Sequence, residues 1–291
     1  MTLSFWGSSG LHTEEPDDTP LVSVVIPVYN GLSFLDQTLA SVCCQDYPRF
    51  EIILVDGGST DGSAAYVHSL RLKVPLITAF LPEGSSPAQT WSYACSLASG
   101  MFIKMMGQDD LLEPGSLSHQ VALLSQNYSA GMISGLRSII DSQNSIPLRR
   151  RGLQGLCQGP VSGQAALRAC YLAGTNIIGE PFAVLFRRDA LVSALPWTDE
   201  RPLLLDLDLY TKVLAEWNLF VDRKVVGSFR ISNTSLSFKT AESHHAQFRA
   251  WQQDYYRLNH QMSILLRLRA WIAAYIQIAL RSFAYRLIAN R

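Results

Sequence analysis

The chain has 291 residues, of which 48% are apolar and 16% are charged. This composition is typical of a globular protein with a hydrophobic core and argues against a disordered or fibrous chain. The formal net charge at pH 7 is zero, which gives the chain no bulk attraction for polyanions, so we expect no nucleic-acid partner.

The chain opens with a segment, residues 1–20, that lacks the basic start and apolar stretch of a signal peptide, and we expect a flexible leader. Leu21–Ile26 is then a continuous apolar run, typical of a strand that is covered on both faces. Apolar residues recur at helical spacing from Phe34 to Val42, which predicts a helix. Phe50–Val55 is predicted to be a second buried strand.

Strands and helices continue to alternate as far as residue 106. We expect a helix at about Ser63–Leu70, a strand near Leu76–Phe80, a helix near Ala88–Leu97 and a strand at Met101–Met106. This order indicates right-handed βαβ units and a parallel sheet, in which ligands bind beyond the carboxyl ends of the strands. Polar loops follow the strands at Pro27–Gly31, Asp56–Gly62 and Gly107–Asp110. The sequence therefore predicts an α/β fold with its site along one edge of the sheet.

The second half of the chain is less regular. Ser142–Gly163 contains Arg149, Arg150, Arg151 and several glycines, and we expect a mobile loop there. The remaining elements predicted from apolar patterns are a strand at Phe182–Phe186, a helix at Leu203–Ala215, and strands at Leu219–Val226 and Phe229–Ile231. We divide the chain into the leader, a main domain over residues 21–240 and a helical tail over residues 241–291.

Asp56 ends a buried strand and is followed by two glycines, which let the backbone approach a ligand closely. Its carboxylate is suited to accept hydrogen bonds from a nucleoside base or ribose. A carboxylate in this position also braces turns and caps helices. Both interpretations stay open on spacing alone.

Asp109 and Asp110 are adjacent carboxylates directly after an apolar strand. Their mutual repulsion is costly unless a cation or hydrogen bonds offset it. A divalent cation that bridges carboxylate and diphosphate meets this need, and hard oxygen ligands suit Mg²⁺ or Mn²⁺. Alternatively, one of the two aspartates caps a helix that begins at Glu113-Pro114.

Asp206 and Asp208 lie two residues apart on a predicted helix, so their side chains point to different faces. One of them can face the cleft as a general base. The other is then solvated or pairs with Lys212, one helical turn further on.

Several segments, taken together and in order, resemble family 2 glycosyltransferases over about Leu21–Ser237. These segments are VSVVIPVYNG…FLDQTLASVCCQDYPRFEIILVDGGSTDGS at the start, ASGMFIKMMGQDDLLEPGSL at the metal-binding strand, GEPFAVLFRRDAL and LLLDLDLYTKVL on the acceptor side, and FRISNTSLS at the closing strand. The resemblance implies the GT-A fold and an enzyme that transfers sugar with inversion from a nucleotide-diphosphate sugar, using Mg²⁺ or Mn²⁺.

The resemblance also implies roles for individual residues. Asp206 matches the catalytic base, and Asp109 matches the metal-contacting last aspartate of the family's Asp-x-Asp motif, with Asp110 as a second metal ligand. The implied nucleotide-sugar-binding residues are Pro27, Tyr29, Asn30, Asp56, Gln108, Asp109, Arg230 and Ser232. Three positions depart from the family pattern, because Gly107, Leu205 and Ser92 replace residues that are usually acidic or Asn.

The tail is basic, with seven arginines and one acidic residue from His244 to Arg291. Within it, Leu265–Ile288 is apolar with recurring arginines, but no uncharged run reaches the about 18 residues that a spanning helix needs. Such a helix either lies on an anionic inner leaflet or packs on the main domain or a dimer partner.

The resemblance predicts a donor of the UDP or dTDP type and a glycan or lipid-linked acceptor in cell-surface polysaccharide synthesis. Five cysteines without metal-ligand spacing are typical of reduced thiols. We therefore expect a cytoplasmic location, at the inner face of the membrane if the tail binds lipid, with a homodimer as the other use of the tail. The alternative function is a catalytically weak nucleotide-sugar-binding subunit of a larger synthase, which the absent acidic residues at Gly107 and Leu205 motivate.

Overall fold

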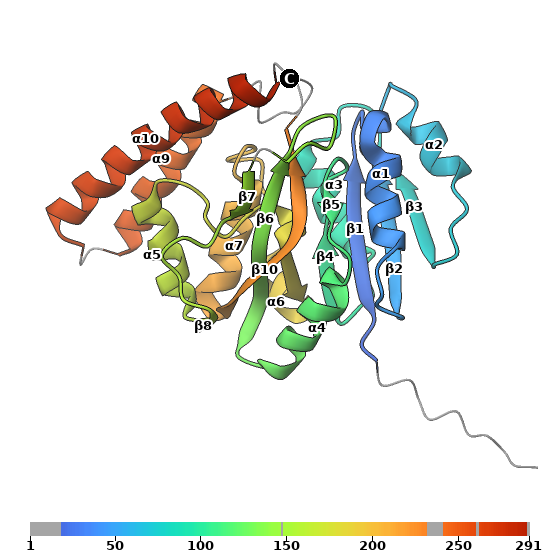
Figure 1. Cartoon of the computed structure of the whole chain (residues 1–291), viewed down its shortest axis with the longest axis horizontal. Coiled ribbons are helices and arrows are strands. Elements are labelled where there is room, and N and C mark those ends of the chain that lie inside the picture. Colours follow the sequence, from blue (N-terminus) through green and yellow to red (C-terminus); the bar gives the residue numbers. More distant parts are fainter. Residues whose placement is uncertain (1–18, 147, 232–240, 260–261, 290–291) are drawn as a thin grey trace, which may run out of the picture.

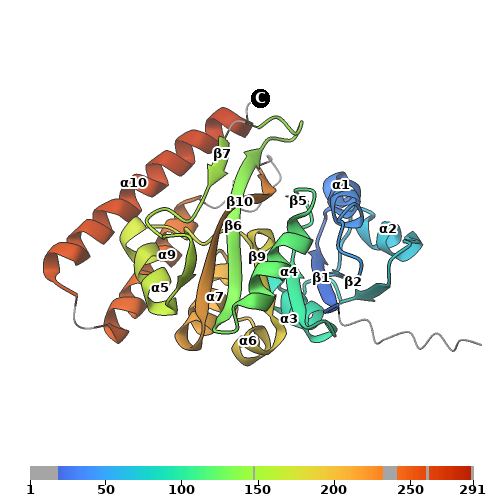
Figure 2. The same cartoon turned by 60° about the horizontal axis from the view of Figure 1, so that its bottom comes forward.

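The computed structural model describes residues 19–146, 148–231, 241–259 and 262–289. Its centre is one mixed sheet with helices packed on both faces (Figures 1 and 2). The strand order is β3-β2-β1-β4-β9-β6-β10-β5, with β7 paired to β6 and β8 paired to β10.

The first half of the sheet is parallel. Its strands are β1 (Val22–Val28), β2 (Phe50–Asp56), β3 (Leu76–Phe80) and β4 (Phe102–Met105), connected by α1 (Leu32–Cys43), α2 (Ser63–Ser69) and α3 (Pro87–Ser96). Both faces of β1 are buried, because Val24 and Ile26 pack into one core while Val25 packs into the other. The strands and helices predicted as far as residue 106 are confirmed to within a few residues.

The second half mixes strand directions. Its elements are β5 (Leu111–Leu112), α4 (Ser116–Gln126), β6 (Ala130–Ile140), β7 (Leu148–Arg151), β8 (Gly159–Val161), α5 (Gly163–Ala173), the 3₁₀ turn η1 (Pro181–Ala183), β9 (Val184–Arg187), α6 (Arg188–Ala194), α7 (Leu205–Glu216) and β10 (Asn218–Arg230). β9 runs antiparallel to both β4 and β6, whereas β6 and β10 are parallel to each other.

Three sequence predictions need correction here. The expected loop Ser142–Gly163 contains β7 and β8, because backbone pairing with β6 and β10 overrides its polar, glycine-rich composition. The two expected last strands are one strand, β10, whose register shifts against β6 instead of breaking. The predicted strand Phe182–Phe186 begins two residues later, after η1.

The helix expected at Glu113-Pro114 also starts later, at Ser116. Gly115 is its N-cap residue, with φ of 69°, and the first-turn N–H of Leu117 donates to Gln45 Oε1 (3.0 Å). Neither Asp109 nor Asp110 therefore caps this helix, and the capping interpretation of the pair is wrong.

The helical tail is confirmed as two helices, α9 (Ala241–Leu258) and α10 (Ile264–Ala289), which pack against each other and, through α10, against α5 (Figure 1). Trp251 of α9 and Ala274 of α10 are buried in the core that the main domain forms on one face of the sheet. Within the described residues, no helix is both long and apolar enough to cross a membrane.

Candidate active site

The carboxyl ends of β1, β2 and β4 meet at one edge of the sheet, because the three strands are parallel neighbours. Asp56 is the last residue of β2 and pairs with Val28 at the end of β1. The loops predicted to carry the site therefore lie together at this edge, as the strand order requires.

The two carboxylate oxygens of Asp56 have different surroundings. Its side chain is 1% exposed, and Oδ1 accepts hydrogen bonds from the backbone N–H groups of Gly58 (3.0 Å) and Ser59 (2.8 Å). Oδ2 is buried and has no hydrogen-bond partner among the described residues. A buried carboxylate oxygen without a partner is costly. The structure thus supports the turn-bracing interpretation for Oδ1 and leaves Oδ2 for a ligand.

The loop after β1 is clamped by the loop after β4. Gln108 Oε1 accepts from the Tyr29 N–H (2.7 Å), and Gln108 Nε2 donates to the Tyr29 carbonyl (2.9 Å). A Cβ at Gly31 would overlap Gln108 Oε1, so a larger residue there would displace the Gln108 side chain from this clamp. Asn30 adopts φ of 50°, and its Oδ1 accepts from the Thr60 N–H (2.8 Å). The Tyr29 ring stays 56% exposed at the edge of the site.

Asp109 and Asp110 follow β4 at the same edge. Burial raises the pKa of Asp109, and burial together with the charge of Asp109 raises the pKa of Asp110 well above its usual range. Asp110 Oδ1 accepts from the Arg230 N–H (3.2 Å), and a Cβ at position 107 would lie 2.5 Å from Asp110 Oδ2. Gly107, which departs from the family pattern, thus provides the space that the Asp110 carboxylate occupies.

Arg230 is fully buried at the end of β10, and its guanidinium stacks 4.5 Å from the ring centroid of Phe34. The guanidinium donates to four oxygens, namely Asp109 O (2.9 Å), Asp141 O (3.0 Å), Asn144 Oδ1 (2.7 Å) and Gln37 Oε1 (3.0 Å). With these partners Arg230 fixes the backbone of the two aspartates and places a positive charge beside them. Ser232, which was predicted together with Arg230 to bind the nucleotide-sugar, lies outside the described residues.

The donor set at Asp109 and Asp110 fits a hard divalent cation only in part. Two adjacent carboxylates with raised pKa values offer hard oxygen ligands and gain from a neighbouring positive charge. No group of three or more His, Cys, Asp or Glu residues that could hold a metal occurs in the described parts of the chain. A cation here needs diphosphate oxygens and water to complete its ligand shell.

Asp206 lies in the first turn of α7, where the helix dipole favours a negative charge. Its Oδ2 accepts a 2.8 Å hydrogen bond from Asn176 Nδ2. Asp208 instead binds Arg201, with 2.9 Å between Oδ1 and Nε, while Lys212 donates to the Pro196 carbonyl. Asp208 is therefore neither solvated nor paired with Lys212, the two alternatives predicted for it, whereas Asp206 is bonded to Asn176.

Glu180 is a further charged residue of the site, and the sequence patterns did not single it out. It forms an ion pair with Arg137, and its negative charge raises the pKa of both Asp110 and Tyr210. Tyr210 is one helical turn from Asp206 on α7, and burial is the largest cause of its raised pKa. The Gly-Glu-Pro sequence before η1 was the only signal for this residue.

Residues 23–192 match the model of the family described as glycosyl transferase family 2, a match over more than half of the chain. The chain belongs to this family. An uncharacterized glycosyltransferase of Rickettsia typhi is 25% identical over 86% of this chain and 76% of its own length. A Haemophilus influenzae glycosyltransferase is 32% identical over 38% of this chain, and the chain spans 44% of that protein. A Bacillus subtilis protein described as the putative teichuronic acid biosynthesis glycosyltransferase TuaG is 28% identical over 44% of this chain and 51% of its own length.

Solved structures agree on the fold. S. aureus TarS residues 1–349 in complex with UDP superimposes with a TM-score of 0.56 at 20% identity, over 79% of this chain and 64% of that one. The mannosyltransferase PcManGT from Pyrobaculum calidifontis, in complex with GDP-Man and Mn²⁺, gives 0.58 at 19% identity, over 94% of this chain and 84% of that one. The expected GT-A fold is thereby confirmed.

Proposed function

We propose that the chain transfers a sugar, with inversion, from a nucleotide-diphosphate sugar to a hydroxyl of a glycan or lipid-linked acceptor. The observation that carries this proposal is the buried Oδ2 of Asp56, which lacks a partner at the same sheet edge as Asp109 and Asp110. A nucleoside base carries N–H groups that suit Asp56, and a diphosphate suits a cation held by the other two.

At the donor end, we propose that Pro27, Tyr29 and Asn30 line the pocket for the nucleotide. The Gln108 clamp holds the Tyr29 backbone in place, and the exposed Tyr29 ring is free to lie against the donor. Asp109 and Asp110 would hold Mg²⁺ or Mn²⁺, which would neutralise the charge that develops on the leaving diphosphate. We assign Arg230 a positioning role, because its guanidinium binds four protein oxygens.

At the acceptor end, Asp206 would take the proton from the attacking hydroxyl as general base. The Asn176 hydrogen bond and the start of α7 both favour its ionised form. One base and direct displacement at the anomeric carbon give inversion.

The relatives support the kind of donor and acceptor. TarS was solved with UDP and with UDP-GlcNAc, and PcManGT with GDP-Man and Mn²⁺. We propose a UDP or dTDP sugar as the donor here. The similarity to the teichuronic acid protein supports an acceptor in cell-surface polysaccharide synthesis.

We also propose that α10 rests on the cytoplasmic face of an anionic membrane. Apolar side chains on α10 are exposed at helical spacing, including Leu265, Leu268, Ile272 and Ile276. A cavity of about 780 Å³ between α9 and α10 is lined by Arg249, Arg257 and Arg267. The variant Leu268→Gln/Ile272→Gln should bind vesicles containing phosphatidylglycerol less tightly than Val192→Gln, an exposed control on α6. Equal binding, with a dimer lost in the first variant, would assign this face to a second copy.

A thermal-shift panel tests the central proposal. We expect one nucleotide-sugar to raise the melting temperature strongly with Mn²⁺ and much less without it. With Mn²⁺ and at about 100 times its Kd, this donor should add ~2.7 kcal/mol to the free energy of unfolding. Stabilisation by none of the UDP, dTDP and GDP sugars would reject the donor site. Stabilisation without any release of nucleotide diphosphate would support the alternative, a binding subunit of a larger synthase.

A further inference from the structure

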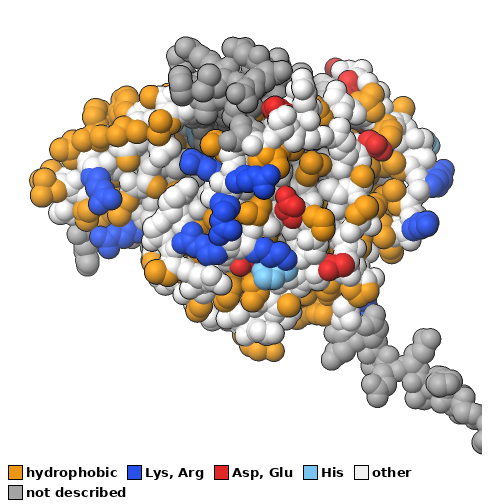
Figure 3. Space-filling view, viewed as in Figure 1, with side chains coloured by type: hydrophobic (Ala, Val, Ile, Leu, Met, Phe, Trp, Pro, Cys, Tyr) orange, Lys and Arg blue, Asp and Glu red, His pale blue; other side chains and the backbone are white. Residues whose placement is uncertain are grey.

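Basic side chains gather on the face of the molecule over β6, β7 and β10 (Figure 3). We define the basic patch as Arg149, Arg150 and Arg151 of β7 with Arg223 and Lys224 of β10. Four of the five are exposed, and Arg223 is half-buried. None of the ion pairs among the described residues involves them. The patch thus carries five positive charges without a carboxylate partner in that part of the chain.

Both strands of the patch bulge at these residues. On β7, Arg149 and Arg150 lie opposite a single residue of β6, and Arg150 adopts φ of 55°, which is uncommon outside glycine. On β10, the segment 222–224 lies between Val221 and Val225, which pair with Ser134 and Leu136 of β6. Arg150 Nη2 donates to the Arg223 carbonyl (3.3 Å), so the two bulges meet across β6. Bulges redirect side chains and occur often beside active sites.

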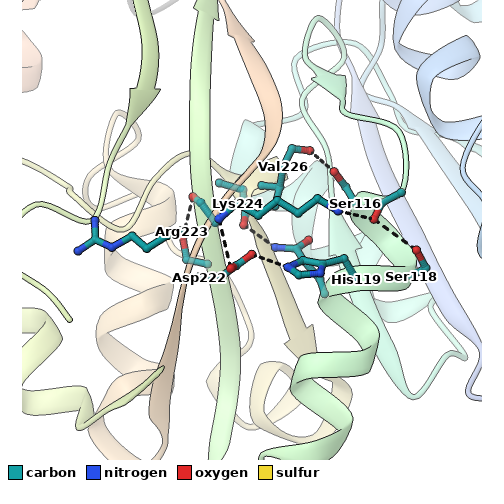
Figure 4. A network of polar contacts seen from close by, with 12 residues as sticks. Ser116, Ser118, His119, Asp222, Arg223, Lys224 and Val226 are labelled. Atoms are coloured by element: carbon teal, nitrogen blue, oxygen red, sulfur yellow. Dashed lines mark hydrogen bonds and ion pairs between the residues drawn. The ribbon is translucent and has the colours of Figure 1, made fainter. Parts of the chain in front are cut away.

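The one carboxylate in these bulges is turned inward. Asp222 is 4% exposed, its Oδ2 lies 2.9 Å from His119 Nε2, and its Oδ1 accepts from the Lys224 N–H (3.2 Å). Figure 4 shows the side chains of Arg223 and Lys224 extending to opposite sides of this network. Asp222 therefore holds the bulge and does not neutralise the surface.

The patch is continuous with the proposed acceptor side of the site. Arg151 pairs across the strands with Arg137, which forms the ion pair with Glu180. The carbonyl of Gly179, which precedes Glu180, accepts a hydrogen bond from Asn176 Nδ2 (3.1 Å), and the same Nδ2 donates to Asp206 Oδ2 (2.8 Å). A chain bound along the patch therefore leads toward the proposed base.

We propose that the basic patch binds an anionic acceptor, a glycan whose units carry carboxylate or phosphate groups. This inference rests on the proposed function and names the acceptor class. Guanidinium groups bind carboxylates and phosphates through paired hydrogen bonds. The five patch residues are all basic, so they offer no aromatic ring on which nucleic-acid bases could stack. Beside them Ile146 and Leu148 are exposed, two apolar side chains that are far fewer than the apolar face of an interfacial helix. An acidic glycan is the polyanion that fits both features.

Binding of polygalacturonate oligomers, measured by calorimetry, tests the inference against neutral dextran oligomers and single-stranded RNA. The patch variant is Arg149→Gln/Arg151→Gln/Lys224→Gln. The matched control is Arg71→Gln/Arg168→Gln/Lys73→Gln, which removes the same charges from exposed positions elsewhere. We expect the patch variant to bind polygalacturonate roughly tenfold more weakly at about 0.05 M salt, the control to match the wild type, and added salt to weaken binding.

Equal affinity of the two triple variants would overturn the inference, as would binding of RNA without polygalacturonate. The donor thermal shift with Mn²⁺ is measured on the same proteins and should be unchanged in the patch variant. If no donor stabilises the wild type with Mn²⁺ while polygalacturonate still binds the basic patch, the proposed function alone is rejected. Donor stabilisation without polygalacturonate binding would reject the acceptor class alone.

Discussion

Asn176 Nδ2 donates a 2.8 Å hydrogen bond to Oδ2 of Asp206, a residue thirty positions further along the chain. The orientation of the Asn176 amide is fixed, because its Oδ1 accepts the N–H groups of Ile178 (3.0 Å) and Gly179 (3.2 Å). Asn176 therefore ties the loop before η1 to the first turn of α7. It is a positioning residue for the proposed base.

Replacing Asn176 with Ala should lower kcat about tenfold and leave the donor KM nearly unchanged. A hydrogen bond donated to a carboxylate favours the ionised form, so its loss should move the acid limb of the kcat profile to higher pH. A pH series of initial rates measures both effects. A change in melting temperature without any movement of the acid limb would mean that Asn176 is only structural.

Asp56→Asn should weaken donor binding by roughly 10- to 150-fold while keeping the turn folded. The Asn carbonyl can still accept from Gly58 and Ser59, but the free carboxylate oxygen is lost, at a typical cost of ~1.5–3 kcal/mol for a hydrogen bond to a charged group. Equilibrium binding of the donor identified in the thermal-shift panel measures the change. Asp36→Asn, which removes an exposed carboxylate on α1, is the control. Equal affinity of the two variants would remove Asp56 from the donor site.

Gly107→Ala should impair Mn²⁺-dependent donor binding although it removes no ligand atom. The added Cβ would lie 2.5 Å from Asp110 Oδ2, so the carboxylate must move. Titration of Mn²⁺ against the donor-bound protein should show a higher apparent Kd. Unchanged Mn²⁺ affinity would show that Asp110 takes no part in holding the cation.

Lys104 predicts a specific dependence of stability on pH. Burial lowers its pKa to about 7, whereas the unfolded chain keeps the ordinary value of 10.5. Between these values the unfolded chain binds the extra proton, so the free energy of unfolding rises with pH by up to about 1.4 kcal/mol per unit. Lys104→Met removes this dependence together with the hydrogen bond from Lys104 Nζ to Gln120 Oε1, so its stability relative to the wild type should be highest at about pH 7 and fall toward pH 10.

Urea denaturation of the wild type and the Lys104→Met variant, compared at each pH, isolates this contribution from the other titrating groups. The exposed variant Lys73→Met should follow the wild type throughout. A difference between Lys104→Met and the wild type that stays constant from pH 7 to pH 10 would contradict a buried neutral lysine.

The sequence was sufficient for the parallel half of the fold. β1 and β2 are continuous apolar runs that are buried on both faces, and such runs identify strands without further information. The loops after them then had to share one edge, which placed Asp56 with Asp109. β7 could not be predicted in this way, because Leu-Arg-Arg-Arg is exposed and is held as a strand by its pairing with β6.

The partners of the site residues were beyond sequence reasoning. The family pattern pointed to Asp206, but nothing in the spacing indicated that Asn176 or Glu180 would reach the site. Arg230 was expected near the diphosphate, and only the structure shows its bonds to the backbone of Asp109 and Asp141. Such contacts depend on how β6, α7 and β10 pack, and no local period records that packing.

Release of nucleotide diphosphate by Asp206→Asn and Asp208→Asn tests the account most directly. The two variants are isosteric with the wild type and lie on the same helix turn. Asp206 is the proposed base, and Asp208 is bound to Arg201. We predict that Asp206→Asn lowers the rate roughly 10²–10⁴-fold, the usual contribution of a general base. Asp208→Asn should lose stability and keep most of its activity. Wild-type activity in Asp206→Asn would contradict the assignment of the base.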